Sequence, residues 1–369
     1  MKLTRSSLLG AIGFATLLTA CTETTDPQPA GPYTNGVFVL NSGNFSDNNG
    51  SLSWLTRAGK TGTPDRAETD LFQVRNRRPI TGGLQGYVEA GNRGLILVDN
   101  SSAGLDKIEI VTSDSLRSVK TLSAPDIENP RYAVRISDTK VYVTCWGSTG
   151  TYPNFYINPG YVAVIDLTSN TITKRIPLQK GAEGITVVGN EAFIGGSGGD
   201  KLVQVIDTQT DLLKTSISVA SDIGKLLPDA NNKLWGLSGK NVVRIDPVGK
   251  TVEATLPVGH DTRKSPGNLT ASADRRSFYF TYSFYDAADN YTQKGELYNF
   301  KITDATIAST TPVVKRVFSG LGFDPASNLL YAGFTPSYKQ AGYVFRYQPT
   351  GQLIDSVRVE IAPSGFYFK

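Results

Sequence analysis

The stretch GYVAVIDLTSNTITKRIPL, residues 160–178, decides the fold. It contains two short segments rich in Val, Ile, Tyr and Thr, residues 161–166 and 171–176, which are separated by a turn of Leu, Thr, Ser and Asn. Short segments of this composition on either side of such a turn are typical of adjacent antiparallel strands, and neither segment has a helical period. The stretch therefore predicts two consecutive strands of a β-meander.

The same pattern recurs along the chain with a spacing of about 40 to 50 residues, which is the signature of a repeat architecture. The quoted stretch is preceded by another strand-like segment at 140–147 (KVYVTCWG). Similar segments lie at 191–198 (EAFIGGSG), 233–239 (KLWGLSG), 276–283 (RSFYFTYS) and 328–335 (NLLYAGFT). Strands equivalent to its first half follow at 202–211, 241–250, 296–305 and 343–352. With the inner strands at 86–91, 131–137, 184–189, 224–229, 268–272 and 320–325, six repeats run from about residue 85 onward.

A seventh repeat at the N-terminus has strands at 36–42 (GVFVLNS), 51–56 (SLSWLT) and 71–74 (LFQV), but it lacks an inner strand. Residues 364–369 (SGFYFK) alternate in the same way and have no partner of their own. Pairing this last strand beside the first would close the ring and remove the exposed edges that an open sheet leaves. We therefore predict an all-β fold: a seven-bladed β-propeller of four-stranded blades over residues 34–369, closed by the C-terminal strand.

The N-terminus is a targeting segment. Residues 1–20 begin with basic residues and continue with an apolar run that is too short for a stop-transfer helix. The sequence LTAC at its end resembles a bacterial lipobox, so we predict a lipoprotein signal peptide and lipidation of Cys21; the alternative is an ordinary secretory signal with a chance cysteine. Residues 21–33 are polar and contain proline, which predicts a flexible tether. These features predict a lipid-anchored protein of the bacterial outer membrane, facing the cell surface.

Composition argues against several classes of function. The chain has 37 Lys and Arg against 33 Asp and Glu, and residues 1–20 contain two of the basic residues, so the mature chain keeps 35 against 33 and a net charge of +2. This balance offers no basic stripe for nucleic acid. One histidine, His260, excludes a multi-histidine metal site, and no Ser-His-Asp or Cys-His arrangement can be assembled from it. We therefore expect a protein that is not an enzyme and has no metal or cofactor, with a propeller lactonase-type hydrolase as a distant alternative.

Several conspicuous residues are expected to be structural. Cys145 shares a strand face with Val141 and Val143, which predicts a thiol in the core. The repeated Asp166, Asp207 and Asp246 end equivalent strands, and we expect each to accept hydrogen bonds from the backbone of its own turn. His260 is expected on a surface loop.

Function is expected on the loops of one face. If the strands of each blade are counted outward from the axis, the long connections join the second strand to the third: they are 41–50, 99–106, 145–160, 282–295 and 334–342. Insertions gathered on one face of a repeat protein mark its binding face. Rigid aromatic side chains among Asn and Gly suit a bulky organic ligand or a protein surface. The alternative is that these aromatics only cap the blades.

Candidate ligand-binding residues come from these loops and from the openings of inner strands, which place Arg131, Glu183 and Asn268 near the axis. We expect the aromatics of the 145–160 loop to meet those of the 282–295 loop over the mouth of the channel. The candidates are Asn44, Phe45, Arg131, Trp146, Tyr152, Asn154, Phe155, Tyr156, Tyr282, Phe284, Tyr285, Tyr291 and Tyr338.

The segment at 160–178, together with GITVVGNEAFIGGS at 184–197, resembles the YVTN-type (YncE-like) propeller repeat of secreted bacterial proteins. The lipobox, the opening GVFVLNSGNFSDNNGSL, NPRY at 129–132, the loop ending INPGYVAVID and the closing IAPSGFYF are similar to the surface propeller lipoproteins of Bacteroidota, among them the BtuG-type cobalamin-binding proteins. The resemblance implies capture of a bulky nutrient, with a corrinoid as leading candidate, for a TonB-dependent outer-membrane transporter. A protein interaction scaffold or surface-layer propeller is the alternative.

Overall fold

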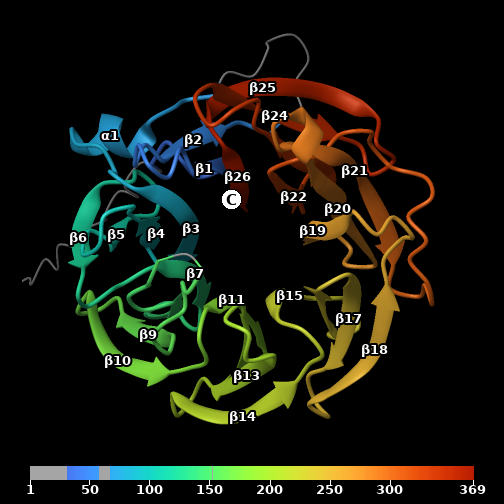
Figure 1. Cartoon of the computed structure of the whole chain (residues 1–369). Coiled ribbons are helices and arrows are strands. Elements are labelled where there is room, and N and C mark those ends of the chain that lie inside the picture. The colour runs from blue at the N-terminus through green and yellow to red at the C-terminus, as the bar shows by residue number, and fades with distance from the viewer. Residues whose placement is uncertain (1–30, 58–66, 152) are drawn as a thin grey trace, which may run out of the picture.

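The computed structural model describes residues 31–57, 67–151 and 153–369, which form seven small antiparallel sheets arranged as blades around a central channel (Figure 1). The prediction of a seven-bladed β-propeller is therefore confirmed. Cys21 and the targeting segment lie outside the described residues, as does Tyr152, so the interpretations of these positions stay predictions. No helix among the described residues is long and apolar enough to cross a membrane.

The blades use consecutive strands, with the innermost strand first except where the ring closes. Blade 1 consists of β26 (Pro363–Phe368), β1 (Val37–Asn41) and β2 (Ser51–Leu55). Blade 2 has β3 (Gly83–Ala90), β4 (Arg93–Asp99), β5 (Lys107–Thr112) and β6 (Ser118–Ser123). Blade 3 has β7 (Pro130–Arg135), β8 (Lys140–Cys145), β9 (Tyr161–Asp166) and β10 (Thr171–Pro177). Blade 4 has β11 (Ala182–Val188), β12 (Glu191–Gly196), β13 (Leu202–Asp207) and β14 (Leu212–Ser218).

The second half of the ring follows the same plan. Blade 5 has β15 (Ile223–Pro228), β16 (Leu234–Ser238), β17 (Asn241–Asp246) and β18 (Thr251–Pro257). Blade 6 has β19 (Ser265–Ala271), β20 (Ser277–Asp286) and β21 (Thr292–Lys301), with a short 3-10 helix, Ala287–Asp289, between the last two. Blade 7 has β22 (Gly320–Asp324), β23 (Leu329–Phe334), β24 (Ala341–Tyr347) and β25 (Leu353–Ile361).

The C-terminal strand closes the ring, as predicted. β26 pairs antiparallel with β1, where Val37 lies opposite Phe368 and Val39 opposite Phe366. The ammonium of Lys369 then reaches blade 2, 2.8 Å from the carboxylate of Glu89. Because the last strand of the chain completes the first blade, the two ends of the propeller hold each other in place.

Blade 1 departs from the prediction of a fourth strand at 71–74. These residues belong instead to a short helix, α1 (Leu71–Asn76), while Trp54 of β2 forms an isolated bridge with Glu68. The prediction failed because Leu71 and Phe72 are adjacent and both buried, whereas neighbouring side chains of a strand point to opposite faces. A helical turn buries both.

Blade 6 also has three strands instead of the four that were predicted. In place of the outer strand, Leu297 of β21 forms an isolated antiparallel bridge with Val314. Five of the seven blades therefore have the expected four strands.

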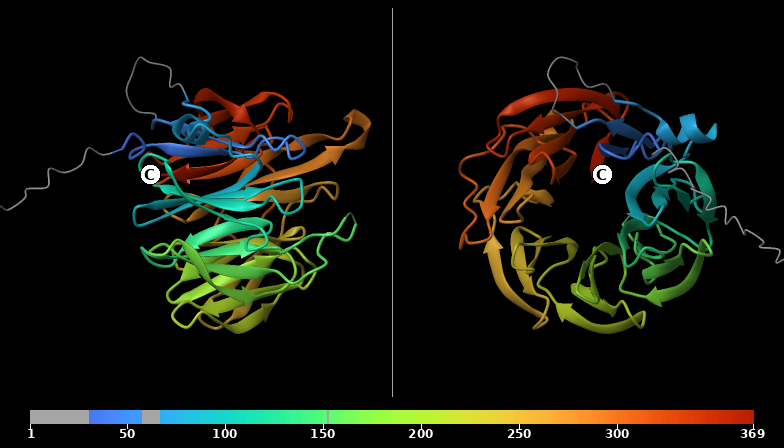
Figure 2. Two further views of the ribbon diagram at one scale, coloured as in Figure 1. Left: turned by 90° about the vertical axis from the view of Figure 1, so that its left-hand side faces the viewer. Right: turned by 180° about the vertical axis from the view of Figure 1, so that it is seen from behind.

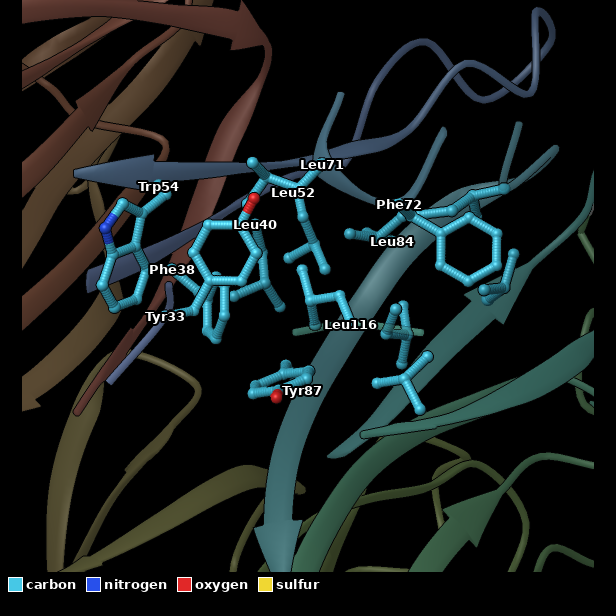
Figure 3. Close-up of a cluster of buried hydrophobic side chains, with 14 residues drawn as sticks. Tyr33, Phe38, Leu40, Leu52, Trp54, Leu71, Phe72, Leu84, Tyr87 and Leu116 are labelled. Carbon is cyan, nitrogen blue, oxygen red and sulfur yellow. The ribbon is translucent and has the colours of Figure 1, made fainter. Parts of the chain in front are cut away.

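The hydrophobic core lies between the blades. Figure 3 shows one such cluster, in which Phe38 and Trp54 of blade 1 face Tyr87 of blade 2, while Tyr33 packs on Phe38. The ring centroids of Phe38 and Tyr87 are 5.0 Å apart in an edge-on arrangement that aromatic pairs favour. Since each blade buries its faces against its two neighbours, a stable core requires the closed ring.

Residues expected to be structural have the predicted roles. The carboxylates of Asp166, Asp207 and Asp246 each accept hydrogen bonds from the backbone N–H groups two and three residues further on. These hydrogen bonds lower the pKa of all three carboxyl groups. Cys145 is a buried core thiol, and burial raises its pKa to about 12. His260 is exposed.

The two faces of the ring differ. The connections between second and third strands, including 42–50, 146–160 and the β20–β21 hairpin tip, project from one face, here called the loop face (Figure 2, left, where this face is on the right). On the opposite face, the backbone N–H of Tyr33 donates to the carbonyl of Asp114, in the turn between β5 and β6, and Lys369 bonds the neighbouring Ser113. The described chain thus begins and ends on the face away from the long loops.

Candidate ligand-binding site

The inner strands carry β-bulges at equivalent positions. In six of the seven inner strands the pairing register shifts near the end of the strand that is closest to the loop face. Bulges re-aim side chains and are frequent beside functional sites. The residues skipped by the pairing, here called the bulge ring, are Gln85, Arg131, Tyr132, Glu183, Gly184, Gly224, Lys225, Asn268, Leu269 and Ser364.

The bulge ring lines a cavity in the channel. This axial cavity has a volume of about 560 Å³ and is lined by every member of the ring except Gly184. A second space of about 660 Å³, the rim hollow, shares Gln85, Tyr132, Asn268 and Ser364 with it. The rim hollow continues outward to Asn44, Phe45 and Tyr338 on the loops. Volumes of 300–1,000 Å³ are usual for small-molecule sites, so the loop face and the channel together form a site of suitable size.

Arg131 is held at the mouth of the channel by three groups. Its guanidinium lies 3.9 Å from the ring centroid of Trp146, which is close for a cation–π contact. One terminal nitrogen is 3.3 Å from Asp99, and Nε is 3.7 Å from Glu183. The loop at 146–160 therefore covers a cation that two carboxylates from neighbouring blades keep in place.

Tyr156 anchors the same loop. Its ring packs edge-on against Trp146, with centroids 5.0 Å apart, and its hydroxyl lies 2.8 Å from the hydroxyl of Ser197. Ser197 donates in turn to Glu183 at 3.1 Å. Trp146 Nε1 lies near Glu183 and lowers the pKa of that carboxyl. The same nitrogen is buried and makes no hydrogen bond of normal geometry. These contacts fix the base of the loop on blade 4.

Asp99 and Glu183 have perturbed protonation. Burial raises the pKa of Asp99 to about 7; Arg131 opposes this effect, and the neighbouring carboxylate of Asp106 adds to it. Burial also raises the pKa of Glu183, against the opposing effects of Arg131, Ser197 and Trp146. Buried carboxyl groups with specific charged partners beside a cavity are features of functional sites.

A second group of contacts spans blades 1, 7 and 6. The amide of Asn44 donates to the backbone carbonyl of Tyr338 at 3.3 Å, and its side-chain oxygen accepts from the N–H groups of Ser46 and Asp47. Tyr338 lies near enough to Tyr285 for the two phenols to interact electrostatically. Asn44 therefore shapes its own loop and joins it to the neighbouring one.

The structure separates two loops that were expected to meet. The 146–160 loop belongs to blade 3 and the β20–β21 hairpin to blade 6, and these blades are not neighbours in the ring (Figure 1). No aromatic pair among the described residues joins the two loops. The expectation failed because the channel, lined by side chains of all seven blades, lies between them. The aromatics form two groups, one on each side of the mouth.

The other candidates vary in position. Tyr282 is only 4% exposed, and its hydroxyl donates to the carbonyl of Asp261, so it lies in the sheet and not on the loop face. Phe284 is half-buried under the guanidinium of Arg263. Asn154 is exposed in its loop. The exposed aromatics of the loop face are Phe45 (55%), Phe155 (45%), Tyr285 (66%), Tyr291 (71%) and Tyr338 (60%). Of these five, only Phe45 and Tyr338 line the rim hollow.

Some lining residues were missing from the sequence-based candidates: Gln85, Tyr132, Lys225 and Ser364. All four belong to bulges. A bulge turns a residue that the alternation assigns to one face toward the other, and a single sequence carries no mark of that shift. Only the place of these residues near the start of an inner strand could have drawn attention to them.

A small hollow of about 300 Å³ lies between residues 47–52 and α1, and two larger hollows lie away from the site. One, of about 620 Å³, is a groove between the outer strands β6 and β10, and the other, of about 780 Å³, lies between turns of blades 4 and 5 on the face opposite the loops. Each of the two larger hollows is lined by residues of two blades, and no long loop of the loop face lines either of them. The bulge ring and the loop face are therefore the stronger candidate.

Comparison with known proteins supports the fold alone. No family model matches the chain, and no curated protein matches it. A quinonprotein alcohol dehydrogenase-like protein from Bacteroides thetaiotaomicron is similar in structure with a TM-score of 0.63 and 14% identity, over 90% of this chain and 78% of that chain. Hydrazine synthase of Kuenenia stuttgartiensis matches with a TM-score of 0.56 and 15% identity, over 76% and 89%.

The Pan2 WD40 domain of Neurospora crassa matches with a TM-score of 0.53 and 12% identity, over 77% of this chain and 81% of that chain. The chain is thus a β-propeller of the general kind found in both enzymes and WD40 domains. Because all three identities are very low, the likeness does not assign an activity.

Proposed function

We propose that this propeller is a binding protein that captures a bulky organic molecule at the loop-face mouth of its channel. The observation that carries the proposal is the bulge ring. Six blades turn polar or charged side chains into one cavity, directly below a rim that exposes Phe45 and Tyr338. Apolar surface with a few converging polar groups is the usual composition of a small-molecule site.

The shape and chemistry of the site favour a large molecule with a flat apolar part and several amide or acidic substituents. Phe45 and Tyr338 offer ring surfaces for stacking at the rim. Beneath them, Gln85, Asn268 and Ser364 offer amide and hydroxyl groups to the cavity. Among molecules of this description a corrinoid is our leading candidate, in keeping with the sequence resemblance to BtuG-type lipoproteins.

The placement of the chain ends supports a surface receptor. The described chain begins on the face opposite the loops, and the predicted tether precedes it. A tether of about ten residues spans at most about 35 Å, so an acyl group on Cys21 would leave the loop face accessible from outside while keeping the propeller at the membrane. Capture beside a TonB-dependent transporter would gain from the high effective concentration that tethering provides.

A second candidate function is a scaffold for a protein partner. It is favoured by the exposed apolar side chains of the loop face outside the rim hollow: Leu105, Phe155, Ile157, Tyr285 and Tyr291. Clusters of exposed apolar residues on a soluble surface mark interaction sites. If the protein is such a scaffold, we expect the partner protein to contact the whole loop face and small molecules not to bind.

Calorimetry and thermal shift with the full chain in detergent test the proposal, with cobalamin, cobinamide and haemin as ligands. A ligand at about one hundred times its Kd adds about 2.7 kcal/mol to the free energy of unfolding. We expect binding by the wild type and a loss of affinity of ten-fold or more, equivalent to about 1.4 kcal/mol, in the double variant Phe45→Ala and Tyr338→Ala.

The matched control is Val248→Ala, which truncates a residue that is 87% exposed in a turn of the opposite face. It should leave the affinity unchanged. If no corrinoid binds, the corrinoid assignment is wrong. If a ligand binds equally well to the double variant, the site lies elsewhere.

A further inference from the structure

The charges that line the two spaces do not balance. The charged residues of the axial cavity are Arg131, Glu183 and Lys225, and the rim hollow has none. Arg131 and Glu183 offset each other at 3.7 Å, and the second carboxylate near Arg131, Asp99, lies behind it outside the lining. Lys225 is therefore left as the uncompensated charge of the cavity wall.

The ammonium of Lys225 has no hydrogen-bond or ion-pair partner among the described residues. Water in the channel reaches the side chain, but the surrounding protein lowers the pKa of Lys225 by partial desolvation, with no carboxylate to oppose the effect. Two other lysines do have such a partner: Lys264 pairs with Glu296, and Lys369 pairs with Glu89. A cation that faces a cavity without a carboxylate partner is available to pair with an anion from outside.

The bulge register places a second polar side chain in the wall of the same cavity. Tyr132, Gly184 and Lys225 are the second bulge residues of three successive inner strands, β7, β11 and β15. Tyr132 lines both spaces, and its hydroxyl has no hydrogen-bond partner among the described residues. Its neighbour Glu183 is engaged by Arg131 and Ser197 on the side of the loop.

Gly184 lies between these two residues along the ring and is the one member of the bulge ring that does not line the cavity. Its Cα hydrogens face β15 so closely that an added Cβ would lie 2.7 Å from the carbonyl oxygen of Gly224. Blades 4 and 5 therefore approach each other closely at this point. Tyr132 and Lys225 thus line the same cavity from blades 3 and 5, on either side of blade 4.

We propose that the axial cavity binds an anionic group, a carboxylate or phosphate oxygen, at the Lys225 ammonium, with the Tyr132 hydroxyl as a further donor in the same cavity. This inference rests on the proposed function only in naming the larger molecule to which the anionic group belongs. In that setting the apolar part stacks at the rim on Phe45 and Tyr338 while an acidic arm enters the channel. The site selects ligands with such an arm over neutral relatives, because hydrogen bonds to charged groups are the stronger ones.

The first experiment uses inorganic phosphate, titrated into the full chain by calorimetry, with chloride replacing phosphate to keep the ionic strength constant. We expect saturable binding that weakens about ten-fold or more in Lys225→Met and persists in Lys225→Arg. Tyr132→Phe should weaken it by a smaller factor, about three- to ten-fold. The control is Lys201→Met, because Lys201 is exposed on the loop face and lines neither space.

A second arm separates this inference from the proposed function. Cobalamin carries a phosphodiester and cobinamide lacks it, so the ratio of their affinities should fall in Lys225→Met and not in Lys201→Met. Phosphate binding that depends on Lys225, without binding of either corrinoid, supports the anion site and refutes the corrinoid assignment. Wild type that fails to bind phosphate, or equal phosphate affinity in Lys225→Met and Lys201→Met, overturns the anion site even if corrinoids bind.

Discussion

Removal of one aromatic side chain from the C-terminal strand should weaken the closure of the ring. Phe368 of β26 packs on Tyr331 of blade 7, with ring centroids 5.3 Å apart, and stacks with Phe366 at 6.2 Å. Truncation of a fully buried Phe to Ala costs about 3–5 kcal/mol. Since Phe368 is half-buried, we expect Phe368→Ala to lower the free energy of unfolding by about 2 kcal/mol.

Equilibrium unfolding in urea measures this loss, with Phe155→Ala as control. Phe155 lies exposed on a loop, so its truncation should change stability by less than about 0.5 kcal/mol. A double-mutant cycle of Phe368→Ala with Tyr331→Ala should give a coupling free energy of about 0.5–1.5 kcal/mol across blades 1 and 7. A loss no larger than that of the control, or a coupling energy of zero, would refute the account of closure.

Three further predictions follow from individual groups. The pKa of Asp99 is raised to about 7 in the folded protein, whereas a carboxyl of the unfolded chain has a pKa of about 3.9. Between these values the folded state binds one more proton than the unfolded state, so the free energy of unfolding should fall as the pH rises from about 4 to about 7. Asp99→Asn should flatten this part of a plot of the urea midpoint against pH. Ser197→Ala removes the partner of Tyr156 and should speed proteolytic cleavage within residues 146–160 in a limited-proteolysis time course, whereas unchanged cleavage would show that the loop is held by other contacts. Cys21→Ala should release the protein from membranes in a fractionation experiment; full retention would place the anchor elsewhere.

The fold was predictable because its information is repeated. Each blade presents the same order of short strands and turns, and Asp166, Asp207 and Asp246 mark the same turn three times. The closing strand was predictable because an inner strand was missing at one end of the chain and an unpaired one was present at the other. The outer strand of blade 1 was not, because a four-residue apolar segment fits a strand and a helical turn equally well.

The site was predictable only where it lies on loops. Phe45, Asn44 and Tyr338 stand out as unusual residues in long connections, and they line the rim hollow. Lys225 and Ser364 lie within strands, where a bulge decides which way each side chain points. The relative positions of the loops also could not be read from their composition, since the width of a seven-bladed ring keeps blade 3 apart from blade 6.

The most direct test of the ligand-binding account is a crystal structure of the propeller with a bound corrinoid or with whichever screened ligand stabilises it. We expect electron density for the ligand in the rim hollow, in contact with Phe45 and Tyr338 and with at least one side chain of the bulge ring. Density on the outer strands or on the face opposite the loops, with the rim hollow free of ligand, would contradict it.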